Sequence, residues 1–301
     1  MGATVVRTSD LTFTYRHGRG ISHVDLDVVK GEVFGFLGPN GAGKTTTIRI
    51  LLDLIRPTSG TAKVLGLDSH TDSLAIRARS GYLPGDFTLP PTLTGVQVLD
   101  WLSSLRPDTP PIRREELVER FDVQLDRPMK QLSKGNRQKL GLVQAFQHAP
   151  ELVILDEPTN GLDPLIQDEF HRFIRDYAEG GGTVFLSSHS LDEVQHTADR
   201  VGIIRDGRLV TVESVDALRR RGVRRVTLTV AEGMGEPNEE RLRSLSGIDG
   251  VSRRGDVFDF AVTGEYAPVL KELSEFPVVD MLSRAADLDE VFLALYRGLD
   301  Q

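Results

Sequence analysis

The chain has 301 residues, of which 39 % are hydrophobic and 27 % charged, a composition typical of soluble globular proteins and not of disordered or fibrous ones. Its formal net charge of -8 argues against a protein whose main task is to neutralise a nucleic-acid backbone, and the basic run at 219–225 is interpreted as a solvated linker. Because there are no cysteines, disulfides, thiolate metal sites and cysteine nucleophiles are excluded. No run of roughly 18 apolar residues predicts a membrane-spanning helix, so any membrane role is expected to go through a partner.

Four short apolar runs, rich in β-branched and aromatic residues, predict the buried strands of one sheet. Because these runs lack polar alternation, they are typical of a parallel sheet covered on both faces, and helical segments separate them along the chain. The pattern therefore predicts an α/β fold. The strands are expected at 32–38, 151–157, 183–189 and 200–207.

Two further regions extend this α/β framework. Residues from about 88 to 148 are helix-like, and we interpret them as a helical subdomain inserted into a first domain at 1–222. The single tryptophan, Trp101, is expected in the core of that subdomain. A small α+β domain is predicted at 223–301, in agreement with the two domains expected for a chain of this length. Its strands and helices are expected at 223–231, 239–245, 256–262 and 287–298.

A glycine-rich loop, GPNGAGKTT, follows the first buried strand and precedes a helical pattern. It fits G-x-x-x-x-G-K-T, and this strand-loop-helix context indicates a phosphate-binding loop. We expect Gly38, Gly41 and Gly43 to adopt backbone angles closed to other residues, so that successive N–H groups surround a polyphosphate. The Lys44 ammonium is expected to reach the terminal phosphates, and the Thr45 hydroxyl to ligate Mg²⁺. The predicted nucleotide-binding residues of this loop are Gly38, Pro39, Asn40, Gly41, Ala42, Gly43, Lys44, Thr45 and Thr46.

Two adjacent carboxylates, Asp156 and Glu157, end the buried strand predicted at 151–157. Such a pair destabilises a buried strand end unless a cation or a proton compensates its charge. Mg²⁺ is the expected cation. Asp156 is predicted to hold it through water, and Glu157 to polarise the water that attacks the γ-phosphate.

A third feature is the segment LSKGN at 132–136, in which Ser133 and Gly135 open a helix. A serine hydroxyl and a run of free N–H groups at a helix N-terminus can bind an anion, with the helix dipole adding to the attraction. Taken alone, the segment would be interpreted as a plain helix N-cap.

These features occur in one order, and over about residues 4–220 they resemble the ATP-binding subunit of ABC transporters. GPNGAGKTT is similar to the Walker A loop, LSKGN to the signature, LVILDEP (152–158) to Walker B, GLDP (161–164) to the D-loop and SSHS (187–190) to the switch region. The resemblance implies an ABC-type P-loop NTPase fold, ATP hydrolysis, and ATP with Mg²⁺ as cofactors.

The resemblance also implies roles for single residues. Tyr15 is expected to stack on the adenine, and His189 to contact the γ-phosphate and hold Glu157 and the attacking water in line. Asp163 is expected to help join two nucleotide sites across a dimer.

A helical subdomain separates Lys44 from Ser133, so one chain is not expected to close both around the same ATP. In the family, two copies pair head to tail, with the signature of one over the Walker A loop of the other, and power a separately encoded integral membrane permease. The resemblance thus implies a homodimer that is cytoplasmic and peripheral on the inner face of the cell membrane. The end of the chain, AADLDEVFLALYRG, is similar to subunits that serve drug and antibiotic exporters.

The chain departs from the family pattern at three positions. Gly85 stands where the family has a glutamine that ligates Mg²⁺, and Asp86, the next residue, is the hypothetical replacement ligand. In the signature, Lys134 and Asn136 replace a glycine and a glutamine. None of these changes affects Glu157 or His189, so hydrolysis is expected to survive.

Two alternatives stay open from the sequence. One is a soluble ABC-type ATPase that acts on nucleic acid or the ribosome, although the acidic balance and the single ATPase unit argue against it and no nucleic-acid partner is expected. The other is a nucleotide-gated binding module with poor turnover, suggested by the missing glutamine. The transported substrate is not readable from this chain.

Overall fold

The structure, a computed structural model, describes residues 2–16, 18–221, 224–231, 237–245, 247–262 and 266–284. The chain divides into two compact units, Met1–Glu213 and Ser214–Gln301. The boundary between the units, at residues 213 and 214, comes slightly earlier in the chain than the domain boundary after residue 222 that the sequence suggested.

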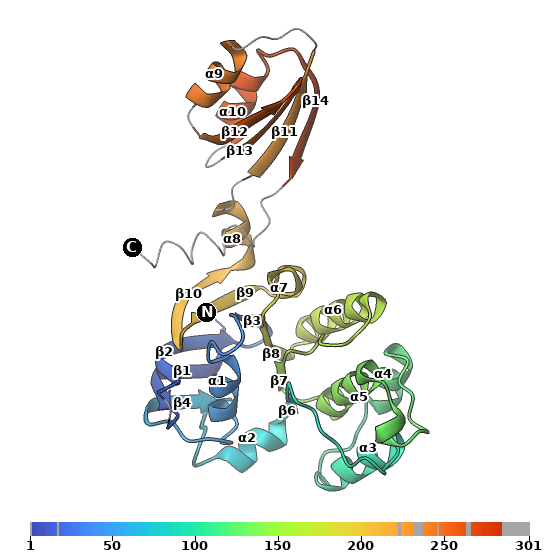
Figure 1. Ribbon diagram of the computed structural model, residues 1–301. Coiled ribbons are helices and arrows are strands. Elements are labelled where there is room, and N and C mark those ends of the chain that lie inside the picture. Colours follow the sequence, from blue (N-terminus) through green and yellow to red (C-terminus); the bar gives the residue numbers. More distant parts are fainter. Residues whose placement is uncertain are drawn as a thin grey trace. The chain divides into compact units, whose positions relative to one another are not determined.

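A six-stranded sheet forms the centre of the first unit, in the order β10-β9-β3-β8-β7-β6 (Figure 1). The pairs β9–β3, β3–β8, β8–β7 and β7–β6 are all parallel, as expected for an α/β fold. All four strands predicted from the apolar runs are confirmed. The strands of this sheet are β3 Val33–Leu37, β6 Ser80–Leu83, β7 Leu152–Asp156, β8 Thr183–Ser188, β9 Arg200–Arg205 and β10 Arg208–Ser214.

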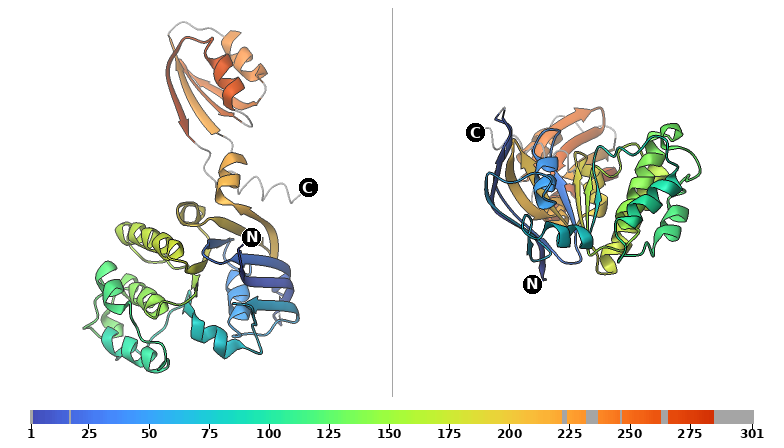
Figure 2. Two further views of the ribbon diagram at one scale, coloured as in Figure 1. Left: turned by 180° about the vertical axis from the view of Figure 1, so that it is seen from behind. Right: turned by 90° about the horizontal axis from the view of Figure 1, so that it is seen from below.

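Every residue of β3, β7 and β8 is buried, which explains why their sequences lack polar alternation. Helix α1 (Lys44–Leu51) contacts β7, and helices α6 (Pro164–Glu179) and α7 (Leu191–Thr197) contact β3 and β8. The helices cover the two faces of the sheet, as the views from two sides show (Figure 2).

A second, antiparallel sheet packs beside α1, which contacts strands of both sheets. Its order is β2-β1-β4-β5, and its buried apolar side chains share one core with those of α1 and the central sheet. The strands are β1 Thr4–Thr14, β2 Gly20–Val29, β4 Ser59–Val64 and β5 Leu67–Asp68.

The helical segment predicted at about 88–148 contains three α-helices and one 3₁₀ turn. Thr94 and Gln97 form a capping box at the start of its first helix, which fixes that boundary. The helices of the first unit not yet given are α2 Ser73–Arg79, α3 Gly95–Ser104, α4 Arg114–Arg120, the 3₁₀ turn η1 Met129–Gln131 and α5 Lys134–Phe146.

The core position expected for Trp101 is wrong, because 47 % of this residue is exposed. Helix α3 turns Val98 and Leu99 inward, and both are fully buried. Trp101 lies on the flank of that inward face, since each residue advances about 100° around a helix.

The second unit has an antiparallel sheet in the order β12-β13-β11-β14, whose core includes Leu228 and Phe258. The strands predicted at 223–231 and 256–262 and the helix at 239–245 are confirmed, whereas the closing helix at 287–298 lies outside the described residues. The elements are α8 Val215–Arg221, β11 Arg224–Val230, α9 Pro237–Ser244, β12 Ile248–Arg254, β13 Val257–Val262, α10 Tyr266–Leu273 and β14 Val278–Arg284.

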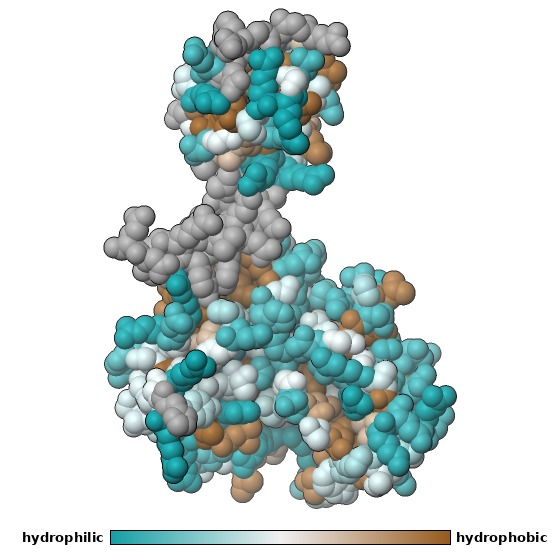
Figure 3. Space-filling model, viewed as in Figure 1, coloured by the Kyte–Doolittle hydropathy of each residue, from teal (hydrophilic) through white to brown (hydrophobic). Residues whose placement is uncertain are grey.

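The basic run at 219–225 is not simply a linker. Helix α8 extends to Arg221 and strand β11 begins at Arg224, so the described arginines belong to regular elements. On the face drawn in Figure 3, the surface of the first unit is mostly hydrophilic, with small separate apolar areas. Within the described part of the chain, no helix combines the length and the apolar character needed to cross a membrane.

Candidate functional site

The predicted phosphate loop connects the end of β3 to the start of α1. Gly43 caps α1 with a φ of 114°, and Gly41 has a φ of 82°, both in the region that favours glycine. Gly38 needs to be glycine for a different reason from the one expected, because its φ is not positive. A Cβ at Gly38 would lie 2.3 Å from the carbonyl oxygen of Ile204, on the neighbouring strand β9.

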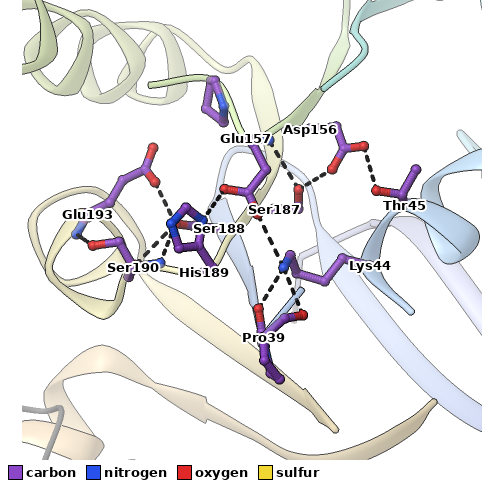
Figure 4. Close-up of polar contacts among 12 residues, drawn as sticks. Pro39, Lys44, Thr45, Asp156, Glu157, Ser187, Ser188, His189, Ser190 and Glu193 are labelled. Atoms are coloured by element: carbon purple, nitrogen blue, oxygen red, sulfur yellow. Dashed lines mark hydrogen bonds and ion pairs between the residues drawn. The ribbon is translucent and has the colours of Figure 1, made fainter. Parts of the chain in front are cut away.

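Lys44, the first residue of α1, is 5 % exposed, and its ammonium group is held at the loop. Its Nζ donates to the carbonyl oxygens of Gly38 at 2.6 Å and Pro39 at 3.3 Å, and it lies 3.2 Å from Glu157 Oε1 (Figure 4). The cation thus lies between the phosphate loop and the predicted catalytic acid.

Asp156 ends strand β7 and is 2 % exposed, so its charge is almost completely removed from water. Two hydroxyl groups donate to it: Thr45 Oγ1 to Oδ2 at 2.7 Å and Ser187 Oγ to Oδ1 at 2.5 Å. Gly85 lies against the same carboxylate, since a Cβ there would be 3.3 Å from Asp156 Oδ2. Thr45 and Asp156, each predicted as a ligand of Mg²⁺, are therefore adjacent in the fold.

Glu157, the next residue, has a φ of 53°, a left-handed conformation that is unfavourable for a residue with a side chain. Its N–H donates to Ser187 O at 3.2 Å, and its carbonyl accepts from Gln138 Nε2 of helix α5 at 3.3 Å. Its Oε2 lies 2.6 Å from Nδ1 of His189, which directly follows β8. Strained backbone at a functional residue is common where surrounding bonds maintain it.

Lys44, Asp156 and Glu157 line one cavity of about 680 Å³ at the carboxyl ends of β3, β6 and β7. Ligands of open α/β sheets bind at this edge, because the loops that follow parallel strands meet there. Tyr15 is 37 % exposed and lies at the cavity wall, with its ring edge-on to Phe13 at a centroid distance of 4.7 Å. The predicted residues that line the cavity are Tyr15, Pro39, Asn40, Gly41, Gly43, Lys44, Thr45, Thr46, Asp86, Asp156 and Glu157. The predicted residues Gly38, Ala42 and His189 do not line it, and His189 is joined to it through Glu157.

Ser133, Gly135 and Asp163 do not line that cavity. They lie together at a second hollow of about 290 Å³. Ser133 and Asp163 both cap helices, with their side chains accepting from the N–H groups of Asn136 and Ile166. Within one chain, the phosphate loop and the signature segment therefore belong to separate sites, as expected.

The two signature substitutions have distinct environments. Asn136 is buried, and its side chain pairs with the backbone of Gln124: Oδ1 accepts from the N–H at 2.9 Å and Nδ2 donates to the carbonyl at 2.9 Å. Lys134 is exposed, and its carbon chain passes over Gly161 in the D-loop segment. Asn136 thus stabilises the loop before α5, whereas Lys134 stays accessible.

Three cavity residues, Arg19, Arg49 and Tyr82, belong to none of the motifs, and only the tertiary fold brings them to the cavity. Asn160 also lines it and could have been found from its place directly before the D-loop segment at 161–164. Burial, with a smaller contribution from the charge of Asp156, raises the pKa of Tyr82 to about 12, so its phenol stays protonated near neutral pH.

Glu193 on α7 was also not predicted from the sequence, although its position four residues after His189, in a polar segment, indicates a place near the site. Burial raises the pKa of this carboxyl to about 7, and the charge of Glu157 adds to the effect. The hydrogen bond from Ser188 acts in the opposite direction.

The substitution Glu193→Gln is expected to stabilise the protein at about pH 8 and to change little near pH 5. The folded-state pKa of about 7 lies above the ordinary 4.5, so the wild type loses stability as pH rises from about 4.5 to about 7. Glutamine has no proton to lose. Chemical denaturation at the two pH values should reveal a difference on the order of 1–3 kcal/mol in the free energy of unfolding. In the control Asp192→Asn, whose side chain is 81 % exposed, this pH-dependent gain should be absent, and a flat profile for Glu193→Gln would contradict the prediction.

Comparison with known proteins agrees with the family resemblance of the sequence motifs. A family described as ABC transporter matches residues 21–160. The bacitracin transport ATP-binding protein BcrA of Bacillus licheniformis is 38 % identical over 225 residues, which cover 73 % of this chain and 72 % of that protein. The daunorubicin/doxorubicin resistance ATP-binding protein DrrA of Streptomyces peucetius is 33 % identical over 304 residues, covering 96 % of this chain and 92 % of that one.

Among solved structures, a dimeric ATP-binding cassette in a post-hydrolysis state, bound to ADP and Pi, superposes with a TM-score of 0.64. It is 22 % identical, and the match covers 70 % of this chain and 98 % of that cassette, so it supports the fold. Together with the phosphate loop, the acidic strand end and the ordered motifs, these matches show that the chain belongs to the ATP-binding subunits of the ABC transporter family, which are ATPases.

Proposed function

We propose that this chain is the ATP-hydrolysing subunit of an exporter, that two copies pair around ATP, and that the pair drives a separately encoded integral membrane permease. One observation carries the proposal. The phosphate loop, Asp156 and Glu157 line one cavity, while Ser133, Gly135 and Asp163 lie at a different hollow of the same chain. Each set has half of the groups needed to enclose a nucleotide.

ATP would be held in the cavity by the N–H groups of the loop and by the Lys44 ammonium, which is buried there and paired with Glu157. A helix N-terminus and a lysine together favour a polyanion. Tyr15, exposed at the cavity wall, is available to stack on the adenine.

Mg²⁺ is the expected metal, and the donor set fits it. The oxygen atoms of Thr45 and Asp156 lie 2.7 Å apart at the cavity, and Asp86 lines the same wall. In the described part of the chain, no three acidic or histidine side chains form a metal cage by themselves. Phosphate and water oxygens would complete the shell, which is the usual arrangement for this ion. The ion would neutralise charge on the phosphates.

Glu157 is proposed as the acceptor for the proton of the attacking water, and His189 as the residue that orients it. Their contact of 2.6 Å means that the histidine fixes one carboxylate oxygen. The left-handed backbone at Glu157 is held in place by the bond from its N–H to Ser187 and by the bond from Gln138 to its carbonyl, so the acid is preorganised before the nucleotide binds.

The second copy would supply the signature residues, which do not line the cavity of their own chain. In the proposed head-to-tail pair, Ser133 and Gly135 of one chain face the phosphates bound to the other, and Asp163 lies at the seam. The fold likeness to a dimeric cassette supports this arrangement. Binding of ATP would close the pair and its cleavage would release it, and the permease would respond to that cycle.

The names of the relatives support the exporter class. BcrA is named for bacitracin transport and DrrA for daunorubicin and doxorubicin resistance. The comparisons give no support to the alternative of an ATPase acting on nucleic acid or the ribosome. The subunit would then be located on the inner face of the cell membrane, held there by its permease.

A pull-down from membranes with the Glu157→Gln variant tests the partner. This variant should retain ATP in the closed pair and keep the complex together, so an integral membrane protein should co-purify in the presence of ATP. The Lys44→Ala variant serves as the control that does not close. Recovery of ribosomes or nucleic acid, with no membrane protein, would overturn the proposal.

Asp86→Ala is expected to raise the Mg²⁺ concentration that gives half-maximal hydrolysis, by roughly tenfold. Asp86 is the described acid nearest in sequence to the missing glutamine, and it lines the cavity. The measurement is phosphate release during a Mg²⁺ titration, with Asp108→Ala, an exposed position outside the cavity, as the control. An unchanged titration curve would remove Asp86 from the list of ligands.

A further inference from the structure

Glu193 is an acid of helix α7 whose side chain does not face bulk water. It is 7 % exposed, and its Oε2 accepts a hydrogen bond of 2.5 Å from the hydroxyl of Ser188 (Figure 4). A carboxylate removed from water to this extent costs free energy unless its hydrogen bonds compensate the loss. Because burying this carboxylate costs free energy, its bond to Ser188 is expected to have a role in the site.

Ser188 and Ser190 flank His189, and both are bound to the start of α7. The Ser190 N–H donates to Ser188 Oγ at 2.9 Å, and the Glu193 N–H donates to Ser190 Oγ at 3.4 Å. The carboxylate of Glu193 therefore closes a small network that includes the residue before His189 and the residue after it. This network fixes the backbone from which the imidazole projects.

Within the described residues, the hydrogen bonds of the Glu193 carboxylate go to the segment of His189 alone. Oε2 accepts from Ser188, and the other oxygen, Oε1, is buried without a hydrogen-bond partner. The carboxylate therefore acts on the strand end that carries His189.

We propose that Glu193 is a positioning residue for ATP hydrolysis, which keeps His189 in contact with Glu157 by holding Ser188 and Ser190, the residues on either side of His189. The inference rests on the roles proposed above for Glu157 and His189. It assigns no contact with nucleotide to Glu193. The phosphate loop lies outside its network, so Glu193 affects turnover and not ATP binding.

The test compares turnover with ATP binding in purified Glu193→Ala. The kcat for phosphate release should fall roughly 10- to 100-fold, as expected when a catalytic contact is misplaced. The KM for ATP and the binding of a fluorescent ATP analogue should stay within about twofold. Glu193→Gln, which can still accept from Ser188, should recover most of the lost kcat.

Ser188→Ala gives an independent route should Glu193→Ala fold poorly. It should lower kcat to a similar extent, and the double variant should be no worse than either single one, because both remove the same network. Val194→Ala is the matched control: Val194 is the next residue of α7, fully buried and apolar, so its truncation should lower Tm and leave kcat unchanged.

Three outcomes would overturn the inference: wild-type kcat in Glu193→Ala, an equal loss of kcat in Val194→Ala, or a loss in KM alone. Failure of the proposed function is distinguishable from these. If Glu157→Gln itself retained turnover, the assigned catalytic role would be wrong. If Glu157→Gln lost turnover while Glu193→Ala retained it, only the positioning role would be wrong.

Discussion

Replacing Glu157 by glutamine is expected to slow ATP hydrolysis by about 10²- to 10⁴-fold while ATP binding persists. The amide keeps the shape of the side chain but cannot accept a proton from water. The strained backbone, the bond that the Glu157 N–H donates to Ser187 and the position against His189 do not depend on the charge of the carboxylate, so the site should stay assembled.

Steady-state phosphate release and equilibrium ATP binding together measure this effect. Size-exclusion chromatography with ATP should also show more dimer than for the wild type, because the nucleotide that joins the two copies is no longer cleaved. Glu151→Gln is the matched control, since Glu151 is a surface acid just before β7 that pairs with Arg79. A Glu157→Gln protein with undiminished turnover would contradict the assignment.

Replacing Lys44 by alanine is expected to weaken ATP binding by about 10- to 100-fold, with hydrolysis falling at least as far. The Nζ of Lys44 has three oxygen neighbours, on Gly38, Pro39 and Glu157, and it is the buried cation of the phosphate loop. Without it, the loop keeps its N–H groups but loses the charge that balances the terminal phosphates, and Glu157 loses its ionic partner.

Binding of ATP by calorimetry and phosphate release under saturating ATP are the two readouts. Lys63→Ala, an exposed lysine on β4, should behave as the wild type in both. The pair of variants separates two kinds of defect: Lys44→Ala affects binding, whereas Glu157→Gln affects chemistry. Hydrolysis at the wild-type rate in Lys44→Ala would contradict the assigned site. A slow wild-type rate, barely above that of Glu157→Gln, would instead favour a nucleotide-gated module with poor turnover.

The central part of the fold could be predicted because its signals are local. The buried strands β3, β7, β8 and β9 are continuous apolar runs, and the loop between β3 and α1 has a fixed glycine spacing. Since parallel strands end at one edge of a sheet, their terminal residues had to lie close together. Asp156 and Thr45 are 111 residues apart in the chain, and yet Thr45 Oγ1 lies 2.7 Å from Asp156 Oδ2 in the fold.

What could not be predicted depends on packing between distant segments. Trp101 is a large apolar residue on an amphipathic helix, and only the orientation of α3 decides that it stays exposed. Gly38 is required by the close approach of Ile204 from β9, a contact that no spacing in its own loop encodes. Arg19, from the turn before β2, and Tyr82, from β6, reach the cavity for the same reason.

Strand β8 lies between β3 and β7, and its last two residues have partners on different elements. Ser187 donates to Asp156 of β7, and Ser188 donates to Glu193 of α7. Successive residues of a strand project to opposite faces of a sheet, so inserting one residue into β8 would exchange these two directions. An insertion within β8 is therefore expected to separate Ser187 from Asp156 and Ser188 from Glu193 at once, and so to disturb both carboxylates of the site together.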